Sequence, residues 1–600
     1  MTQKKISNKF VESILTEFTN NYGLDELEEF KQFEHLCNFL TISKHHPEAF
    51  DSLEVLENVD MDAGSNFGID GGAILVNGNL LLNASDIELY SKSRKLEVTI
   101  VFNQAKTSSN FDSGDISKLG SAVQNFFEET PSIVLSQELT DLKKLYDKIL
   151  EPNTIRLIDR KKFPKVELNF ITTSRHQPNE TIESEAKQIE QNVKSANEDI
   201  AEVNFNLLGS DYINDTYDDL TNKYTVKIKF DRRIELDTIK DVSGSYIGYL
   251  DFNNFLELVT DNNNQIRNNI FYENVRDFQG VDNKVNTEIN ETLTSESLRD
   301  KFILLNNGIT VVAKQLTPLQ NNEYELGEFQ IVNGCQTSNM LYLHKNNDDI
   351  KSNLFVPIKL IHTQDNEVIS KIVKATNRQT PVPDEAFVAL DKFHQNLQKF
   401  FELESKNLTE KIYYERRSRE FQHSDNKIQK YKIVNVHKQI RSFTAVFLNE
   451  PHTVATQHPY NILRSKKDLL FNKTHQYESY FIASYILYFI NSDIAKRIII
   501  GNQITLSYYI AMMMRILITR NVKITHFNGK EIQSEYKTLL ATITKVDERK
   551  KIYPVLFKIL NEVKANFKKT NNLKSDKQAI GYRSFKDEII KKLIEHIKSA

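Results

Sequence analysis

The chain has 600 residues, more than a single hydrophobic core usually serves, so we expect two to four domains. Its composition, 40% hydrophobic and 26% charged, is that of a globular protein, and a net charge of −4 excludes binding to nucleic acid through overall positive charge. Two cysteines, Cys37 and Cys335, exclude a disulfide framework and a zinc site of the usual spacing. The longest apolar stretch, 498–514, is too short and too polar for a membrane span, and we expect it to form a buried helix. The N-terminus lacks the apolar core of a secretion signal, so we expect a cytoplasmic protein.

The first predicted element is a helix that starts near Leu24. Its apolar stripe recurs at helical spacing and contains Leu27, Phe30, Cys37 and Leu40. Glu34 falls within this stripe. A carboxylate that points toward a core usually meets a metal, an arginine or a lysine, so Glu34 is a candidate metal ligand. The alternative places Glu34 at the edge of the stripe, in water.

A glycine-rich segment surrounds Asp70, in the sequence Gly-Ile-Asp-Gly-Gly at 68–72. Asn77-Gly78 between two apolar runs predicts a hairpin, because both turn positions favour positive φ. A strand then runs from Leu96 and places alternate residues on one face: Leu96, Val98, Ile100, Phe102, Gln104 and Lys106. Burying an amide and an ammonium at the end of an apolar face is costly unless both have partners there. The strand end near Asp70 is therefore a candidate site.

A helix over 115–129 and a strand over 165–173 complete a predicted α/β core. Asp70 followed by Gln104-Ala-Lys106 resembles the PD-(D/E)XK nuclease superfamily, in the variant of Mrr-like restriction enzymes where glutamine replaces the acid. The resemblance implies that Asp70 and Gln104 bind Mg²⁺ or Mn²⁺, with Glu34 as an added acid, and that Lys106 orients the attacking water. The alternative is a surface lysine beside a structural glutamine.

The middle of the chain begins with polar, acidic helices over 184–218, followed by an alternating strand at 224–230. Beyond it, Asn307-Gly308 precedes a β-branched strand, and Gly334 follows another strand. Thr337 or Ser338 can cap a helix that begins at Asn339. This strand–turn–helix is either an anion-binding concavity or an ordinary capped turn. Cys335 lacks a diagnostic histidine, and we do not expect it to be catalytic.

Four motifs in this region occur in order, at 274–280, 305–313, 329–338 and 375–382. Together they resemble the AIPR (abortive infection phage resistance) family. The motif positions are Asn307, Gly308, Asn333, Gly334, Gln336 and Thr337. The resemblance implies bacterial anti-phage defence, and members of the family often carry a nuclease-like N-terminal domain.

A segment at 411–422 interleaves aromatic and basic residues, as nucleic-acid grooves do. The candidate nucleic-acid-binding residues are Tyr413, Arg416, Arg417, Arg419 and the earlier Arg378. Glu415 and Glu420 leave open the alternative of a solvated helix face.

We therefore expect a multidomain protein of α/β and α+β class. Its predicted parts are a nuclease-like core (1–180), a helical extension or connector (181–235), an α+β AIPR core (236–430) and a helical C-terminal region (431–600). The expected function is a Mg²⁺-dependent DNA endonuclease of anti-phage defence, acting on phage or host DNA. The alternative is a non-catalytic sensor or regulatory subunit that binds nucleotide or nucleic acid. Partner proteins of a defence operon and a second copy of the chain are candidate partners, and no membrane is expected.

Overall fold

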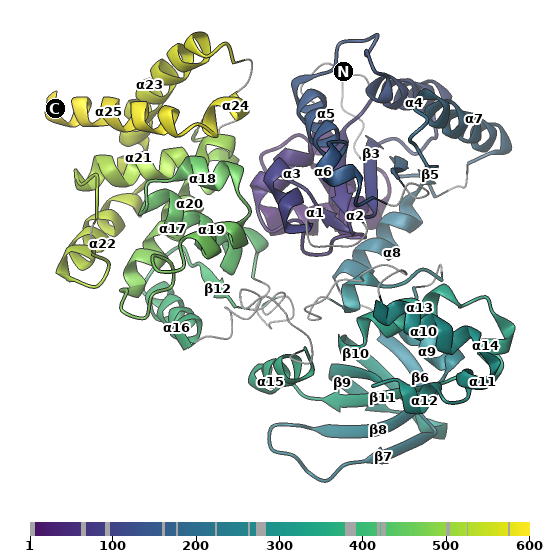
Figure 1. The fold of residues 1–600 in the computed structure, drawn as a ribbon. Coiled ribbons are helices and arrows are strands. Elements are labelled where there is room, and N and C mark those ends of the chain that lie inside the picture. The colour runs from purple at the N-terminus through teal and green to yellow at the C-terminus, as the bar shows by residue number, and fades with distance from the viewer. Residues whose placement is uncertain are drawn as a thin grey trace.

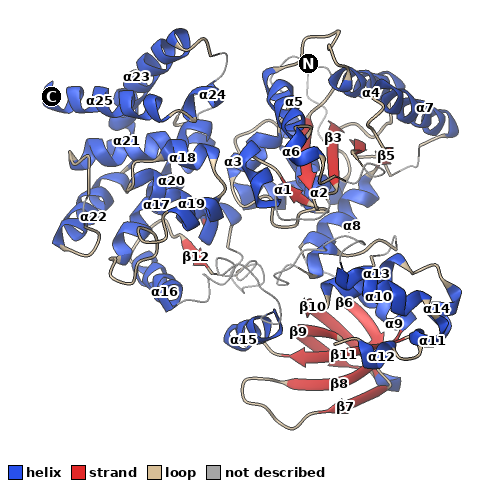
Figure 2. Ribbon diagram, in the orientation of Figure 1, coloured by secondary structure: helices blue, strands red, loops and turns tan. Residues whose placement is uncertain are grey.

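The structure is a computed structural model of the 600-residue chain. It describes residues 6–61, 68–90, 96–158, 163–175, 178–221, 225–261, 264–271, 284–377, 392–416, 421, 428–499, 504–524, 526–573 and 576–599. Three units follow one another along the chain: an N-terminal unit around one sheet, a central unit around a second sheet, and a helical C-terminal unit (Figures 1 and 2). The prediction of a mixed α/β, multidomain protein is confirmed.

The N-terminal unit is built on a five-stranded sheet in the order β2-β1-β3-β4-β5. The strands are β1 (Gly71–Val76), β2 (Asn79–Leu80), β3 (Val98–Lys106), β4 (Lys165–Thr172) and β5 (Glu202–Leu208). β1 pairs antiparallel with β2 and β3, whereas β3, β4 and β5 are parallel. Every residue of β3 from Ile100 to Ala105 is buried, so both faces of the sheet are covered.

Helices cover the two faces of this sheet. One face carries α1 (Lys9–Tyr22), α2 (Glu29–Ser43), α3 (Leu53–Val59) and α8 (Ser210–Leu220). The other carries α4 (Ser113–Phe127), α5 (Gln137–Ile149) and α7 (Glu180–Ala196). Two short helices, η1 (Ala84–Tyr90) and α6 (Pro152–Ile155), lie in the connections.

Local sequence signals in this unit were mostly right. The hairpin at Asn77-Gly78 is confirmed, with φ of 50° and 80° at the two turn residues. The predicted inner face of β3 is buried up to Gln104, and Lys106 is only partly exposed. The helix predicted from Leu24 begins instead at Glu29, because α1 ends at Gly23 in the left-handed region and the chain turns before restarting.

Two expectations for this region need correction. Phe30 is 44% exposed, since the later start of α2 leaves it outside the inner stripe, which begins at Phe33. The acidic helices expected over 184–218 are present as α7 and α8, but β5 lies between them and extends the N-terminal sheet.

The central unit contains a six-stranded sheet in the order β6-β10-β9-β11-β8-β7. The strands are β6 (Thr225–Lys229), β7 (Arg232–Glu235), β8 (Gly244–Asp251), β9 (Ile309–Pro318), β10 (Glu323–Asn333) and β11 (Phe355–His362). One face is covered by α9 (Phe252–Val259), α10 (Lys284–Thr294), α11 (Glu296–Arg299), α12 (Phe302–Leu305), α13 (Cys335–Leu343) and α14 (Asp348–Asn353). The other face is covered by α15 (Asn366–Asn377). Short 3-10 turns are η3 (Asn268–Ile270) and η4 (Gln320–Asn322).

The helix after Gly334 begins four residues earlier than predicted. Gly334 itself is the N-cap, with φ of 103°, so Thr337 and Ser338 lie in the first turn of α13 and do not cap it. The Thr337 hydroxyl instead pairs with the Asn306 side chain.

The C-terminal unit is helical, as predicted. Its helices are α16 (Lys392–Lys406), α17 (Val436–Val446), α18 (Pro451–Thr456), α19 (Pro459–Ser465), α20 (Tyr477–Ala495), α21 (Ser507–Thr519), α22 (Lys530–Ile543), α23 (Val546–Thr570), α24 (Asp576–Ile580) and α25 (Arg583–Ser599). Two short parallel strands, β12 (Tyr413–Glu415) and β13 (Ile433–Asn435), and the turns η6 (Lys430–Lys432) and η7 (Ile504–Leu506) complete it. Of the stretch 498–514 that was expected to form one buried helix, only 507–514 lies in α21; 504–506 form η7, and 500–503 lie outside the described residues. Within the described part of the chain, no helix has the length and apolar character that crossing a bilayer requires.

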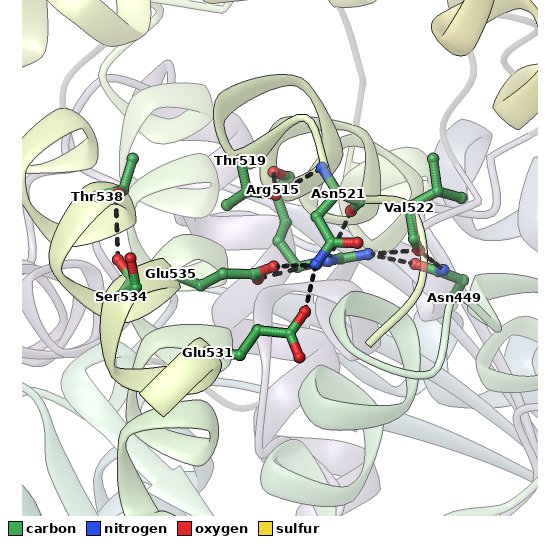
Figure 3. A network of polar contacts seen from close by, with 9 residues as sticks. All are labelled: Asn449, Arg515, Thr519, Asn521, Val522, Glu531, Ser534, Glu535 and Thr538. Carbon is green, nitrogen blue, oxygen red and sulfur yellow. Dashed lines mark hydrogen bonds and ion pairs between the residues drawn. The ribbon is translucent and has the colours of Figure 1, made fainter. Parts of the chain in front are cut away.

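A buried polar network fixes the packing of α21 against α22 (Figure 3). Arg515 is completely buried and donates to the backbone carbonyls of Asn521 and Val522 and to the Asn449 side chain. Its guanidinium also lies 3.6 Å from a carboxylate oxygen of Glu535. A buried charge with this many partners holds the loop after α21 in one conformation.

The N-terminal and helical units contact each other directly, although they are far apart in sequence (Figure 1). Arg441 of α17 forms an ion pair of 3.2 Å with Glu54 of α3. The Asn435 side chain donates to Asp51 at 3.2 Å. Polar contacts of this kind couple the positions of the two units.

Candidate functional site

Asp70 lies directly before β1 and opposite the end of β3. Its backbone N–H donates to the Asn103 carbonyl at 2.8 Å, and its carboxylate accepts a hydrogen bond from the Ala105 N–H at 2.7 Å. Ala105 stands between Gln104 and Lys106. The structure therefore holds the Asp70 carboxylate against the strand segment that carries both other predicted residues.

Gln104 is 2% exposed, on the side of β3 that faces α4. Its carbonyl oxygen Oε1 is buried and has no hydrogen-bond partner among the residues that the structure describes. Gly68, at φ of 80°, lies so close that an added Cβ would stand 3.0 Å from Gln104 Nε2. An unsatisfied buried carbonyl is unfavourable in a static core and calls for a water, an ion or a ligand.

Lys106 ends the strand, with 32% of its side chain exposed. Its ammonium lies 3.3 Å from the carboxylate of Asp115, in the first turn of α4. Burial alone would raise the pKa of Asp115, but Lys118 and Lys106 outweigh it and lower that pKa. Sequence reasoning missed Asp115, although an acid near the start of the predicted helix was visible.

Glu34 is buried on α2, 8% exposed, and does not lie in water. Lys31, one turn earlier, donates to the Glu34 carboxylate at 2.9 Å and to Asp60 at 2.8 Å. Burial and the neighbouring charge of Asp70 raise the pKa of Glu34 to about 7, while Lys31 opposes this rise. Glu34 and Asp70 thus belong to one electrostatic cluster.

Lys31 and Asp60 were also missed, although the spacing of three residues between Lys31 and Glu34 is typical of a helical ion pair. Burial lowers the pKa of Lys31, but Asp60 and Glu34 outweigh it and raise that pKa. Lys31 is therefore a cation fixed beside the acids.

A ladder of buried amides supports the opposite face of β3. Asn103 donates to Asn38 of α2 at 2.9 Å and to Thr41 at 2.7 Å, and it accepts from Asn169 at 2.9 Å. Asn206 continues the ladder by donating to Asn169 at 2.8 Å. A hydrogen-bond network in which every amide has a partner fixes the position of α2 relative to β3. It therefore also fixes the position of Glu34.

Asp70, Glu34 and Gln104 carry oxygens of the kind that Mg²⁺ and Mn²⁺ prefer, although Gln104 lies on the α4 face of the sheet and α2, which carries Glu34, lies on the other face. Mg²⁺ uses oxygen ligands, often one or two carboxylates, and keeps several waters. The buried Gln104 carbonyl without a described partner is the structural observation that favours such an ion. No group of three or more His, Cys, Asp and Glu side chains able to hold a metal occurs among the described residues, so a metal here would rely on two carboxylates and an amide.

The AIPR-motif residues meet where β9 begins and β10 ends. The Asn306 side chain accepts from the Gly308 N–H at 3.0 Å, and Gln336 accepts from Asn286 of α10 at 2.8 Å. Asn333 pairs with Thr310 across the strands beyond a bulge, and an added Cβ on Gly334 would stand 2.8 Å from Ile309. Asn307 is exposed beside them. The motif at 274–280 lies outside the described residues.

The predicted nucleic-acid-binding residues are only partly described. Arg416 is 8% exposed; its Nε donates to Gln398 at 2.7 Å and its Nη2 lies 3.2 Å from Glu367. Tyr413 is half-buried, with its ring centroid 5.8 Å from that of Phe421. Arg378, Arg417 and Arg419 lie outside the described residues. The described guanidinium is thus directed into the protein.

These features define a multidomain α/β protein in which a compact sheet unit with clustered acids and lysines precedes a second sheet unit and a helical unit. The family model described as AIPR protein matches residues 271–572, just over half of the chain. The chain therefore belongs to the AIPR family, whose name refers to abortive infection, a form of anti-phage defence. The match spans most of the central and helical units, and the N-terminal unit lies outside it. Comparison with curated proteins and with solved structures found no match.

Proposed function

We propose that this AIPR protein is a metal-dependent DNA endonuclease of bacterial anti-phage defence, with its active site at the end of β3. Asp70, Glu34 and Gln104 would hold Mg²⁺ or Mn²⁺, and Lys106 would contact the phosphate and the attacking water. The observation that carries the proposal is the buried side-chain carbonyl of Gln104, which has no described hydrogen-bond partner. The next residue, Ala105, donates its N–H to the Asp70 carboxylate.

The residues divide the chemistry between them. When bound, the metal supplies positive charge that polarises the phosphate and makes a bound water more acidic. The Ala105 N–H holds the Asp70 carboxylate in place before a metal binds, so little conformational entropy is lost when the carboxylate coordinates it. The Lys106 ammonium stabilises the negative charge that grows on the phosphate in the transition state. Glu34, with a pKa raised to about 7, gives up a proton when a cation arrives.

The test is cleavage of supercoiled plasmid by the full chain with Mg²⁺ or Mn²⁺. Asp70→Asn and Lys106→Met should each lower the rate by about 100-fold or more, the usual effect of removing one group that stabilises the transition state. Lys118→Met is the matched control, because Lys118 contacts the same Asp115 carboxylate at 3.2 Å yet is mostly exposed. Cleavage by both active-site variants at the wild-type rate would exclude the site.

Metal binding is measured separately, by electron paramagnetic resonance of Mn²⁺. Asp70→Asn should weaken Mn²⁺ binding, whereas Lys106→Met should leave it nearly unchanged. The sensor alternative replaces the nuclease if three results occur together. The full chain binds a nucleotide in calorimetry, the Gly334→Val variant does not bind it, and no metal-dependent cleavage is found.

The path of DNA is tested by the salt dependence of binding. Arg417→Gln with Arg419→Gln should reduce the slope of log affinity against log salt by about two, if each arginine contacts one phosphate. Arg416→Gln should leave that slope unchanged and lower the melting temperature, because its guanidinium is occupied by Gln398 and Glu367. A normal slope in the double variant would place the DNA elsewhere.

A further inference from the structure

A cavity of about 200 Å³ lies between the N-terminal and helical units. Its walls come from residues 22–26 at and after the end of α1, residues 51–53, parts of the segment 430–442, one side of α20 with Lys496 after it, and Tyr508 of α21. One buried water needs roughly 10–15 Å³ when volume is measured in the same way as for this cavity. The cavity therefore has room for an organic molecule of about a dozen non-hydrogen atoms. Because the walls belong to both units, an occupant would contact both at once.

Most of the wall is apolar or aromatic. It includes Tyr22, Leu53, Val434, Leu487 and Tyr508. Small-molecule sites typically combine such a wall with a few polar groups that fix orientation. The question is therefore which charged groups line it.

Lys438 of α17 lines this wall, together with Lys430 and the exposed Lys496. Its ammonium donates to the Ile433 carbonyl at 2.7 Å, which uses one of three N–H groups. Among the described residues it has no other hydrogen bond and no ion pair within 4.0 Å. Burial lowers the pKa of Lys438 to about 8, and Asp51 only partly offsets this.

Asp51 lines the same wall from the N-terminal unit, together with the exposed Asp25 and Glu26. Asn435 donates to one carboxylate oxygen at 3.2 Å, and the other oxygen accepts no bond from the described residues. Burial alone would raise the pKa of Asp51, but Lys438, Arg441 and His437 outweigh it and lower that pKa. Asp51 is thus charged at neutral pH.

The Lys438 ammonium and the Asp51 carboxylate line one cavity without forming an ion pair with each other. Desolvating a cation and an anion that do not pair is unfavourable, unless another group satisfies both. Two further lining residues, Ser52 and Asn491, have buried side-chain oxygens with no hydrogen-bond partner in the described part of the chain. The wall therefore offers donors at Lys438 and unused acceptors elsewhere.

We infer that the cavity binds a small zwitterion of the α-amino-acid class with an apolar side chain. The ligand carboxylate would accept from the free N–H groups of Lys438, and its ammonium would donate to Asp51. Its side chain would lie along the tyrosine and leucine wall. This site is separate from the candidate nuclease site, and the inference does not depend on the proposed nuclease activity.

The first experiment measures binding of L-phenylalanine to the full chain by calorimetry. Two analogues that each lack one charge serve as probes: phenylpropionate, without the ammonium, and phenethylamine, without the carboxylate. Both should bind at least about tenfold more weakly, because each forfeits a charge-assisted hydrogen bond. Glycine tests whether the apolar wall contributes, and it should also bind more weakly.

The second experiment uses variants of the wall. Lys438→Met, and separately Ala495→Phe to fill the cavity, should each abolish L-phenylalanine binding, while the exposed Lys467→Met should have no effect. Melting curves of each variant show that it is folded, and Ala495→Phe leaves both charges in place. No binding of L-phenylalanine by the wild type, equal binding of phenylpropionate, or unchanged binding in Ala495→Phe would each overturn the inference.

Discussion

Glu34→Gln should make the metal-free N-terminal unit more stable at alkaline pH. The pKa of Glu34 is raised from 4.5 to about 7 in the folded protein, chiefly by burial and by Asp70. The folded state therefore binds this proton more tightly than the unfolded state, and the stability that it contributes is lost as the pH rises from 4.5 through about 7. Glutamine keeps the shape and a carbonyl for Lys31 but carries no charge.

The size of the effect follows from the two pKa values. The difference between 4.5 and about 7, at about 1.4 kcal/mol per pH unit, corresponds to a cost of about 3 kcal/mol at pH 8. Lys31 retains Asp60 at 2.8 Å in the variant, so it does not become an unpaired buried cation. We expect a gain of up to about 3 kcal/mol at pH 8 and little change at pH 4.5.

The assay uses the two cysteines of the chain. Cys37 is buried on α2, one turn from Glu34, and Cys335 lies in the central unit. In a Cys335→Ser background, a pulse of thiol reagent across a urea series reports unfolding of the N-terminal unit alone. Wild type and Glu34→Gln are compared at the same pH, which cancels the pH dependence of thiol reactivity.

Equal urea midpoints for the two proteins at pH 8 would refute the reasoning, as would a lower midpoint for Glu34→Gln. Either result would mean that the Glu34 carboxylate is satisfied within the apo protein. The acid cluster would then be a structural network and not a site that awaits a cation.

Mn²⁺ binding should release about one proton from Glu34 near pH 6 and none in Glu34→Gln, as measured by calorimetry in buffers of different ionisation enthalpy. Gly71→Ala should destabilise the N-terminal unit by about 2 kcal/mol or more, because the new Cβ would stand 1.8 Å from the Asn38 side chain, whereas Gly114→Ala in α4 should be nearly neutral in the same thiol assay. Arg515→Met should lower the melting temperature through a loss of about 3 kcal/mol or more, because it leaves Glu535 buried with one partner fewer; an unchanged melting curve would show that the network in Figure 3 is dispensable.

The sequence by itself determined the features that depend on local chain chemistry. Asn77-Gly78 favours positive φ at two adjacent positions, and this fixed the hairpin. The alternation from Leu96 to Lys106 fixed which side chains of β3 share a face, because successive side chains of a strand point to opposite faces; it did not show that the other face is buried as well. The resemblance to the AIPR family, taken from four motifs in order, was likewise visible in the sequence, and the family match confirms the family.

Tertiary structure decided which side chains share an environment. Spacing could not tell whether Glu34 lies in water, because that depends on the packing of α2 against β3 and on Asp70, which lies far along the chain. The sequence suggested Arg416 as a phosphate ligand, yet its guanidinium contacts Gln398 of α16 and Glu367 of α15. Asp51 and Lys438 are nearly four hundred residues apart and face one cavity only because two units pack together. Burial and long-range charge set pKa values and pairing, and both arise from contacts that no local pattern encodes.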